Sequence, residues 1–237
     1  MEYFRFVDDL EPVCIMMENV PLLREYPLFK KMVSMLENRG YSIDIDVVNI
    51  AEYGVPQRRK RLVMIGSKLG EMRIAEGNKR AVTVRDVIKN LESVETTNDT
   101  SHQTVQTHSE RIKKIISAIP KDGGSRKDLP EEYWLNCHKK TNVGFNDVYG
   151  RLAWDSVSST ITGGCLNPSK GRFLHPEENR CITAREAALL QTFPRDYKFP
   201  CDIPRASLAL LIGNALPPTF CKIQALHIKE HLVNKCS

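Results

Sequence analysis

Features that define several protein classes are scarce or missing in this sequence. Its seven cysteines form no Cys-x-x-Cys pair and are odd in number, which argues against a zinc ribbon and against a disulfide framework. Reduced thiols in a cytosol-like compartment fit this usage best. No apolar run approaches the roughly 20 residues that span a bilayer. The N-terminus also lacks the basic start and apolar core of a signal peptide. We therefore expect no membrane segment and no metal site.

The composition is that of a folded domain with a small positive charge. Of 237 residues, 41% are hydrophobic, which is enough for a packed core and makes global disorder improbable. Lys and Arg number 34 against 29 Asp and Glu, a formal net charge of +5. This excess permits a polyanionic partner but does not require one, and an ordinary basic protein would show it too.

Residues 1–67 show the alternating helix and strand patterns of a layered α/β domain. The apolar residues at 43, 45 and 47 alternate as in a strand, whereas those at 28, 29, 32, 33, 35 and 36 recur as on one helix face. The expected order is a helix end at 2–10, a strand at 13–17, a helix at 26–38, a strand at 41–50, a loop at 51–60 and a strand at 62–65.

The pattern changes at about residue 68, where polar and Gly-rich stretches become frequent. Thr183 is a good N-cap, and Glu186 completes a capping box for a helix over 184–191. Further helices are expected at 83–92, 109–119, 205–212 and 219–233, with irregular structure over 144–175. The predicted division is therefore a catalytic α/β part at 1–67, a small domain at 68–204 and C-terminal helices at 205–237 that return to the catalytic part.

The most informative short block is Glu18-Asn19-Val20. It follows the apolar run at 13–17, and a carboxylate after a buried strand lies where open α/β sheets place their chemistry. Taken alone, Glu18 could equally be a solvated residue at the end of a strand.

Three further blocks follow in order: Gly54-Val-Pro-Gln-Arg-Arg-Lys-Arg61, Arg185-Glu-Ala-Ala-Leu-Leu-Gln-Thr-Phe-Pro194 and Gly213-Asn-Ala-Leu-Pro-Pro218. Together with the first block, they resemble the C-terminal two-thirds of a DNA cytosine-5 methyltransferase. The resemblance implies an α/β fold: a partial Rossmann-like methyltransferase domain plus a smaller, largely irregular target-recognition domain. It also implies methyl transfer from S-adenosylmethionine to cytosine C5 in double-stranded DNA (EC 2.1.1.37).

The resemblance assigns catalytic roles to Glu18 and Arg61. A thiolate adds to C6 of cytosine and makes C5 nucleophilic, and an acid at ring atom N3 eases that addition. Glu18 would be this acid, and the Arg61 guanidinium would stabilise charge at O2. Asn19, Gln57 and Arg59 would support the surrounding loops. If the segment is extended, Gln57, Arg59 and Arg61 share one face.

The last two blocks carry structural and cofactor roles. In the family, the block at 185–194 orders the small domain, so Arg185 and Glu186 are expected to be ion-pair and cap residues. Residues 213–218 are expected to open the final helix and to line the S-adenosylmethionine pocket, with Asn214 as the contact residue. A plain helix cap is the alternative for Asn214.

The Gly- and Ser-rich stretch at 144–164 occupies the place where the family recognises its target. Arg151 and Thr160 match the usual DNA-contact positions, since Arg reads guanine and Thr contacts base edges or phosphates. Lys170, Arg172 and His175 are interpreted as phosphate neighbours or structural residues.

Two parts of the family pattern are missing: the Gly-rich loop that binds the cofactor and the Pro-Cys loop that carries the nucleophile. Cys14 lies in a predicted strand and is expected to be a core thiol. Pro200-Cys201 follows the Phe-Pro block, where the family has no catalytic group. We therefore expect the chain alone to be inactive and to need a complementing N-terminal polypeptide.

Other hypotheses remain open at this stage. The chain could be a non-catalytic, sequence-specific DNA-binding remnant of such an enzyme, or one of the RNA cytosine-5 methyltransferases that share the fold. It could be half of a split enzyme, the product of an internal start or frameshift, or a decayed gene. The expected location is the bacterial cytosol or nucleoid, and the family suggests a restriction-modification setting.

Overall fold

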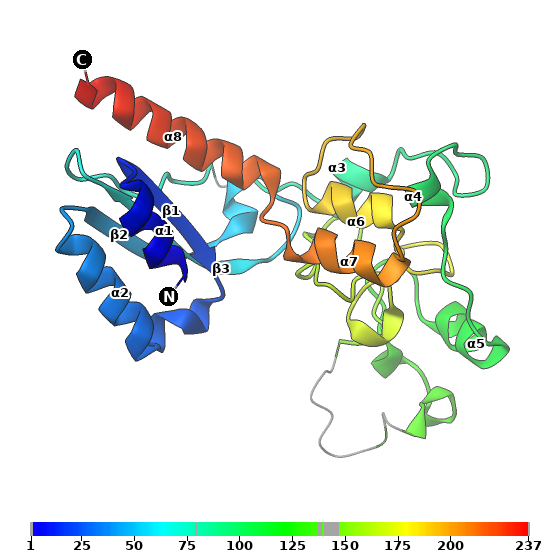
Figure 1. The fold of residues 1–237 in the computed structure, drawn as a ribbon. Helices are drawn as coiled ribbons and strands as arrows, with labels where there is room; N and C mark the ends of the chain where they lie inside the picture. The colour runs from blue at the N-terminus through cyan, green and yellow to red at the C-terminus, as the bar shows by residue number, and fades with distance from the viewer. Residues whose placement is uncertain (1, 79, 137–138, 140–146, 237) are drawn as a thin grey trace. The chain divides into compact units, whose positions relative to one another are not determined.

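The computed structural model describes residues 2–78, 80–136, 139 and 147–236 and shows two compact units (Figure 1). The first unit comprises Met1–Gly54, Arg59–Arg80 and Pro218–Ser237. The second comprises Val55–Arg58 and Ala81–Pro217. These limits differ from the boundaries expected at 67/68 and 204/205, because residues 68–80 belong to the first unit and residues 55–58 and 205–217 to the second.

Hydrogen bonds explain where the units begin and end. Ile74 donates its N–H to Asp44, and Ala75 donates to Gln224, so the segment after residue 67 stays with the first unit. Arg58 donates its N–H to the Ser158 carbonyl at 2.9 Å, which ties residues 55–58 to the second unit.

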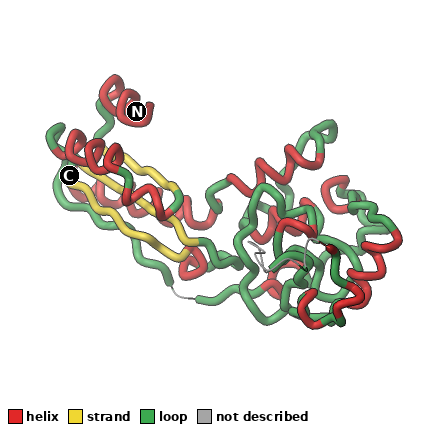
Figure 2. The backbone as a smooth tube through the Cα atoms, turned by 90° about the horizontal axis from the view of Figure 1, so that it is seen from below, coloured by secondary structure: helices red, strands yellow, loops and turns green. Residues whose placement is uncertain are grey.

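A three-stranded sheet forms the centre of the first unit. Its strands are drawn in yellow in Figure 2. The order is β1-β3-β2, and β3 runs antiparallel to both neighbours. The elements are α1 (Glu2–Leu10), β1 (Cys14–Asn19), η1 (Pro21–Glu25), α2 (Pro27–Glu37), β2 (Ser42–Asn49), η2 (Ile50–Tyr53), β3 (Lys60–Ser67) and α8 (Pro218–Cys236). The α/β fold expected from the periodicity is confirmed.

The two faces of this sheet are covered by different helices. Leu62 and Met64 of β3 pack with Phe4 of α1 and with Phe29 and Leu36 of α2. Side chains of a strand alternate, so residues 61, 63, 65 and 67 face the other way. That face meets α8, where Ser67 Oγ lies 2.8 Å from His231 Nε2.

The second unit contains short helices and much irregular backbone. Its helices are α3 (Val84–Ile88), α4 (Thr100–Gln103), α5 (Glu110–Ala118), α6 (Ala184–Leu190) and α7 (Arg205–Asn214), with 3-10 turns η3 (Arg126–Asp128), η4 (Glu131–Tyr133) and η6 (Pro168–Lys170). The capping box of Thr183 and Glu186 is present at the start of α6. The short helix α4, capped by Asp99, falls inside a stretch that the sequence indicated only as polar.

Residues 213–218 lead into the final helix, as the sequence indicated, but Gly213 itself still belongs to the preceding helix, α7. Residues 213 and 214 complete α7, and α8 begins at Pro218, where the missing N–H of proline costs no helical hydrogen bond. A Cβ at position 213 would lie 2.1 Å from the carbonyl carbon of Thr162 and 2.2 Å from the nitrogen of Gly163. Glycine is therefore required because the backbone at 162–163 lies directly against α7.

Helices α7 and α8 together account for the longest apolar stretch of the described residues. By length and composition alone, Arg205–Lys235 is long and apolar enough to cross a membrane, with a mean hydropathy of 1.2. The helix breaks after Asn214, where Ala215 has extended backbone angles. Core helices of soluble proteins meet the same criterion, so this is weak evidence for a span.

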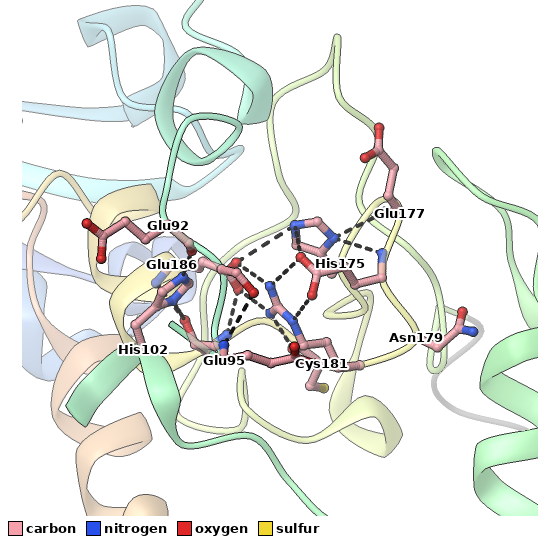
Figure 3. Close-up of polar contacts among 12 residues, drawn as sticks. Glu92, Glu95, His102, His175, Glu177, Asn179, Cys181 and Glu186 are labelled. Atoms are coloured by element: carbon pink, nitrogen blue, oxygen red, sulfur yellow. Dashed lines mark hydrogen bonds and ion pairs between the residues drawn. The ribbon is translucent and has the colours of Figure 1, made fainter. Parts of the chain in front are cut away.

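A buried polar network holds the start of α6 in the second unit (Figure 3). Arg180 donates two hydrogen bonds of 2.8 Å to the Glu186 carboxylate and two more to Glu178. Burial alone would raise the pKa of Glu186, but the hydrogen bonds and charge of Arg180 outweigh it, and the net pKa is lowered. His175 lies 3.8 Å from the same carboxylate, and burial lowers its pKa.

Replacing Glu186 with Gln should destabilise the second unit more at pH 7 than at pH 4. A carboxylate with a lowered folded-state pKa contributes stability that is present above its unfolded pKa and is lost as the pH falls through the folded value. We expect a loss on the order of 3 kcal/mol at pH 7, the cost of breaking a buried ion pair. Urea unfolding followed by tryptophan fluorescence measures it, because Trp134 and Trp154 both lie in this unit.

The matched control is Glu110→Gln, which removes an exposed carboxylate paired with Lys113. Surface pairs contribute about 0–1 kcal/mol, so this variant should unfold like the parent at both pH values. An equal loss for Glu186→Gln at pH 7 and pH 4 would contradict the ion-pair explanation.

Candidate active site and recognition segment

Glu18 and Arg61 form an ion pair on the α8-facing side of the sheet. Glu18 of β1 stands opposite Val63 of β3, and Arg61 lies two residues along β3 on the same face. Diagonal neighbours of this kind are within reach of long side chains. Arg61 Nε lies 2.6 Å from Glu18 Oε1, and the two side chains are 16% and 20% exposed. Both groups are thus held at the edge of solvent, where a ligand could reach them.

The Glu18 carboxylate keeps unused hydrogen-bonding capacity. Its Oε1 atom is buried and makes no directed hydrogen bond, so its contact with Arg61 is electrostatic. Arg59 is nearby and 3% exposed. Burial lowers the pKa of Arg59 to about 10, the charge of Arg61 acts in the same direction, and Glu18 opposes both. The three side chains therefore form one charged cluster with two cations and one anion.

A cysteine of α8 belongs to the surroundings of this cluster, although the sequence motifs did not indicate it. Burial raises the pKa of Cys221, and the negative charge of Glu18 raises it further. Both effects favour the neutral thiol. Its proximity follows from the pairing of α8 with the odd-numbered side of β3, which sequence spacing alone does not reveal.

Asn19 and Gln57 have local structural contacts. Asn19 Oδ1 accepts a hydrogen bond of 2.8 Å from the Val20 N–H, which fixes the exit from β1. Gln57 is fully buried, and its side-chain NH2 donates to the Leu190 carbonyl at 3.0 Å and to Gln191 Oε1 at 2.7 Å. Its Oε1 accepts from the N–H of Ile161. Gln57 thus joins the segment at Ser158–Ile161, which we call the recognition segment after its expected role, to α6. Gln57 belongs to the second unit, whereas Arg59 and Arg61 belong to the first.

Thr160 lies on the recognition segment next to this anchor. Its hydroxyl donates a hydrogen bond of 2.5 Å to the Arg58 carbonyl, and the side chain is partly exposed. The oxygen lone pairs and the methyl group remain available to a ligand. Its role as a DNA contact remains a prediction.

The structure does not support Arg151 as a residue that reads DNA. The side chain is fully buried, and burial lowers its pKa. Its guanidinium donates to the carbonyls of Ile119, His175, Glu178 and Ile116 and to Asn179 Oδ1, at 2.6–3.1 Å. A guanidinium has five N–H donors, and these five bonds use them all. Arg151 is therefore a structural residue that holds the end of α5 against residues 175–179.

Asn214 does not by itself make a cofactor site. Asn214, which the sequence assigned to S-adenosylmethionine, is the exposed last residue of α7 in the second unit. One exposed amide does not enclose a ligand of that size. Within the described ranges, no group of three or more His, Cys, Asp or Glu side chains is placed to hold a metal ion.

Nearly all of the chain matches one protein family. Residues 1–230 match the family described as C-5 cytosine-specific DNA methylase. The chain is 37% identical to the Type II methylase M.HgiDII of Herpetosiphon aurantiacus, over 98% of the chain and 68% of the relative. It is 31% identical to the Type II methyltransferase M1.BsuMI of Bacillus subtilis, over 96% of the chain and 53% of the relative. The chain belongs to the C-5 cytosine-specific DNA methylase family, as the four sequence blocks indicated.

Solved structures show the same fold at lower identity. A DNA modification methyltransferase from an Escherichia coli prophage superimposes with a TM-score of 0.71 at 20% identity, covering 97% of the chain and 72% of that protein. The Dnmt2 methyltransferase of S. pombe superimposes with a TM-score of 0.62 at 18% identity, covering 93% and 67%. The chain thus spans between about half and two-thirds of the length of the curated relatives cited.

Replacing Arg151 with Lys should lower the stability of the second unit. A single ammonium cannot reach five acceptors, so several buried carbonyls would lose their partners at about 1–3 kcal/mol each. We expect a total loss of about 3 kcal/mol or more in urea unfolding followed by tryptophan fluorescence. Arg111→Lys, on an exposed position of α5, is the matched control. If Arg151→Lys unfolds with the parent and binds duplex DNA less selectively, the structural role assigned to Arg151 is wrong.

Proposed function

We propose that this chain is the C-terminal part of a DNA (cytosine-5-)-methyltransferase, EC 2.1.1.37, that methylates cytosine C5 in a specific duplex sequence with S-adenosylmethionine. A complementing N-terminal polypeptide supplies the cofactor loop and the attacking thiolate. The expected location of the active complex is the bacterial cytosol or nucleoid, which contains the DNA. The observation that supports this proposal most directly is the Glu18–Arg61 pair, with its buried carboxylate oxygen that makes no directed hydrogen bond.

The pair supplies what cytosine activation requires. The target base leaves the helical stack, which costs a few kcal/mol. Glu18 contacts N3 of the flipped ring and acts there as the general acid while the thiolate adds to C6. The Arg61 guanidinium stabilises negative charge that develops at O2. Sequence selection belongs to the segment of Thr160, which Gln57 anchors.

The thiols of the described residues favour a nucleophile from elsewhere. Burial raises the pKa of Cys165 to about 12, and burial also raises the pKa of Cys181 well above its usual range. Cys14 lies in β1, with its Sγ 3.6 Å from Ser67 Oγ. Cys201 is exposed in the second unit. A nucleophilic cysteine needs surroundings that favour the thiolate, and Cys165 and Cys181 have the opposite.

The outer edge of β1 is the docking site that we propose for the complementing polypeptide. Among the described strands, β1 pairs on one side only, with β3. Exposed apolar side chains flank it: Phe6 and Leu10 before the strand, Val13 at its start, and Val20 and Leu22 after it. The unpaired N–H and C=O groups of such an edge can hydrogen-bond to a strand of another polypeptide, and the exposed apolar groups can pack against it. The relatives contain additional sequence from which that strand could come, since the chain spans 53–68% of the two cited.

The chain alone should transfer no methyl group to DNA, and co-expression with the N-terminal third of the Herpetosiphon relative should restore transfer from tritiated S-adenosylmethionine. In the complemented enzyme, Glu18→Gln should slow transfer about 100-fold or more, the contribution of a positioned general acid. Duplex binding should persist. Glu25→Gln, an exposed carboxylate in η1, is the control and should leave the rate unchanged.

Methyl transfer by the isolated chain would contradict the proposal that a complementing polypeptide is required. An unchanged rate in Glu18→Gln would remove Glu18 from the chemistry. Duplex binding with no transfer after complementation would favour the alternative of a non-catalytic DNA-binding protein.

Introducing a charged side chain beside the unpaired edge of β1 should prevent the chain from assembling with the complementing polypeptide. Val13→Lys and Val20→Lys alter exposed side chains, so the chain should still fold, but each should abolish co-purification with the complementing polypeptide. Leu226→Lys, an equally exposed apolar position on α8, should co-purify normally. Normal assembly of both edge variants would place the docking site elsewhere.

A further inference from the structure

A cavity of about 960 Å3 lies along the outer edge of β2 in the first unit. Among the described strands, β2 pairs on one side only, with β3. The six consecutive residues 44–49 of this strand all line the cavity. Successive side chains of a strand point to opposite faces, so a continuous lining of this kind belongs to the edge and not to one face. The opposite wall includes residues 73–77 and His227 of α8.

Main-chain groups of every second residue of β2 point toward this cavity. In an antiparallel ladder, alternate residues direct their N–H and C=O groups to the neighbouring strand, and the others direct them away. Ile50 donates its N–H to the Arg59 carbonyl at 2.9 Å, and the regular register gives the even-numbered residues of β2 the same pairing. The main-chain groups of Ile45, Val47 and Asn49 therefore face the outer edge, where a further strand can pair with them.

Asp46 covers one of these outward donors. Its Oδ1 atom accepts a hydrogen bond of 2.7 Å from the Val47 N–H, which agrees with that N–H pointing away from β3. A charged side chain on an edge strand hinders pairing with another strand. A cation on an incoming strand would pair with the Asp46 carboxylate and draw it away from the N–H. The edge therefore favours a partner that brings positive charge.

Carboxylates outnumber cations on the cavity wall, where Lys60 and Arg73 are the cations. The four carboxylates are those of Asp44, Asp46, Glu52 and Glu76. Within the described ranges, none of the four belongs to an ion pair. Burial raises the pKa of Tyr53, and the charges of Glu52, Asp46 and Glu76 raise it further, so these three carboxylates lie near one phenol. The edge thus carries a negative potential.

The two faces of the edge differ in polarity. Asp44 and Asp46 stand opposite odd-numbered residues of β3, and therefore lie on the side that faces α8. Ile45 and Val47 lie on the other side and are partly buried against the core of α1 and α2. An added strand that matches both faces would carry cations on one and apolar side chains on the other, in alternation.

Two other occupants fit this edge less well. Pairing of β2 with the β2 of a second copy would bring Asp44 and Asp46 of the two chains together, and like charges on neighbouring strands are destabilising. A compact small molecule would leave much of the edge uncovered, because six residues of a strand extend about 20 Å at about 3.4 Å per residue. An extended, basic polypeptide meets both requirements.

We propose that the outer edge of β2 binds an extended polypeptide segment in which Lys or Arg alternates with apolar residues, as an added strand of the sheet. The main-chain groups of Ile45, Val47 and Asn49 supply the hydrogen bonds, and the carboxylates around Asp46 pair with the cations. In this mode, main-chain pairing gives affinity and alternate side chains give specificity. The inference goes beyond the proposed function, because it involves neither DNA nor methyl transfer and uses the edge opposite β1.

The test is binding of a fluorescein-labelled heptapeptide of alternating Lys and Val to the full chain, measured by fluorescence anisotropy. A matched peptide of alternating Glu and Val should bind at least tenfold more weakly. Two further peptides carry N-methyl groups on all valines or on all lysines, so each lacks one set of N–H donors at unchanged charge. One of these two should lose about tenfold or more, since several hydrogen bonds are lost. Hydrogen exchange at the N–H groups of Ile45 and Asn49 should slow in the complex.

Asp46→Asn and Glu76→Gln should each weaken binding of the Lys–Val peptide about two- to fivefold, as expected for one exposed ion pair. Both positions are exposed, so the chain should still fold, and an asparagine can still accept from the Val47 N–H. Glu37→Gln, which removes an exposed carboxylate at the end of α2 in the same unit, is the control and should bind like the parent.

Three outcomes would overturn the proposal. Equal binding of the Lys and Glu peptides, or equal losses in the control and in Asp46→Asn, would remove the selection for positive charge. Parent-like binding of both N-methyl peptides, or unchanged exchange at Ile45 and Asn49, would show that no strand is added to this edge. A dimer of the chain that the peptide dissociates, detected by sedimentation velocity, would assign the edge to a second copy.

Discussion

Strand β3 lies between β1 and β2, and the side chains of its residues 62–65 are fully buried. A shift of one residue in its pairing would turn Arg61 away from Glu18 to the face on which Leu62 and Met64 pack, so the register is strongly fixed. The Glu18–Arg61 pair depends on that register, because it joins diagonal neighbours across β1 and β3. The proposed chemistry thus rests on strand pairing, which holds side chains more firmly than a loop does.

In the second unit, the main constraint is how the backbone polar groups find hydrogen-bond partners. With little regular secondary structure, its backbone carbonyls must find partners among side chains. Arg151 donates hydrogen bonds to four backbone carbonyls. Gln57 donates to one backbone carbonyl and accepts from one backbone N–H. Arg180 donates to the Glu186 carboxylate, which caps α6. These long polar side chains replace the ladders of a sheet, which explains why charged residues are so deeply buried here.

Sequence periodicity was sufficient for the elements whose signals are local. The helices at α1, α2, α5 and α8, the three strands and the capping box of α6 all follow from apolar spacing or cap chemistry. Arg151 was misassigned because an arginine in a Gly-rich segment gives the same sequence signal whether it faces DNA or carbonyls 24–35 residues away. The requirement for glycine at position 213 was missed for a similar reason, because it comes from the distant backbone of residues 162–163. The β1-β3-β2 order is likewise a long-range property that spacing does not encode.

The recognition segment is clamped at two points, by the Gln57 amide at Ile161 and by the close approach of residues 162–163 to Gly213. The side chains of Ser159 and Thr160 add two more ties, because their hydroxyls donate to the carbonyls of Arg172 and Arg58. The main-chain path of this segment is therefore dictated by the scaffold and by its own polar side chains together. If the segment meets DNA as proposed, a substitution at 159 or 160 would change both the groups it presents and the support beneath them.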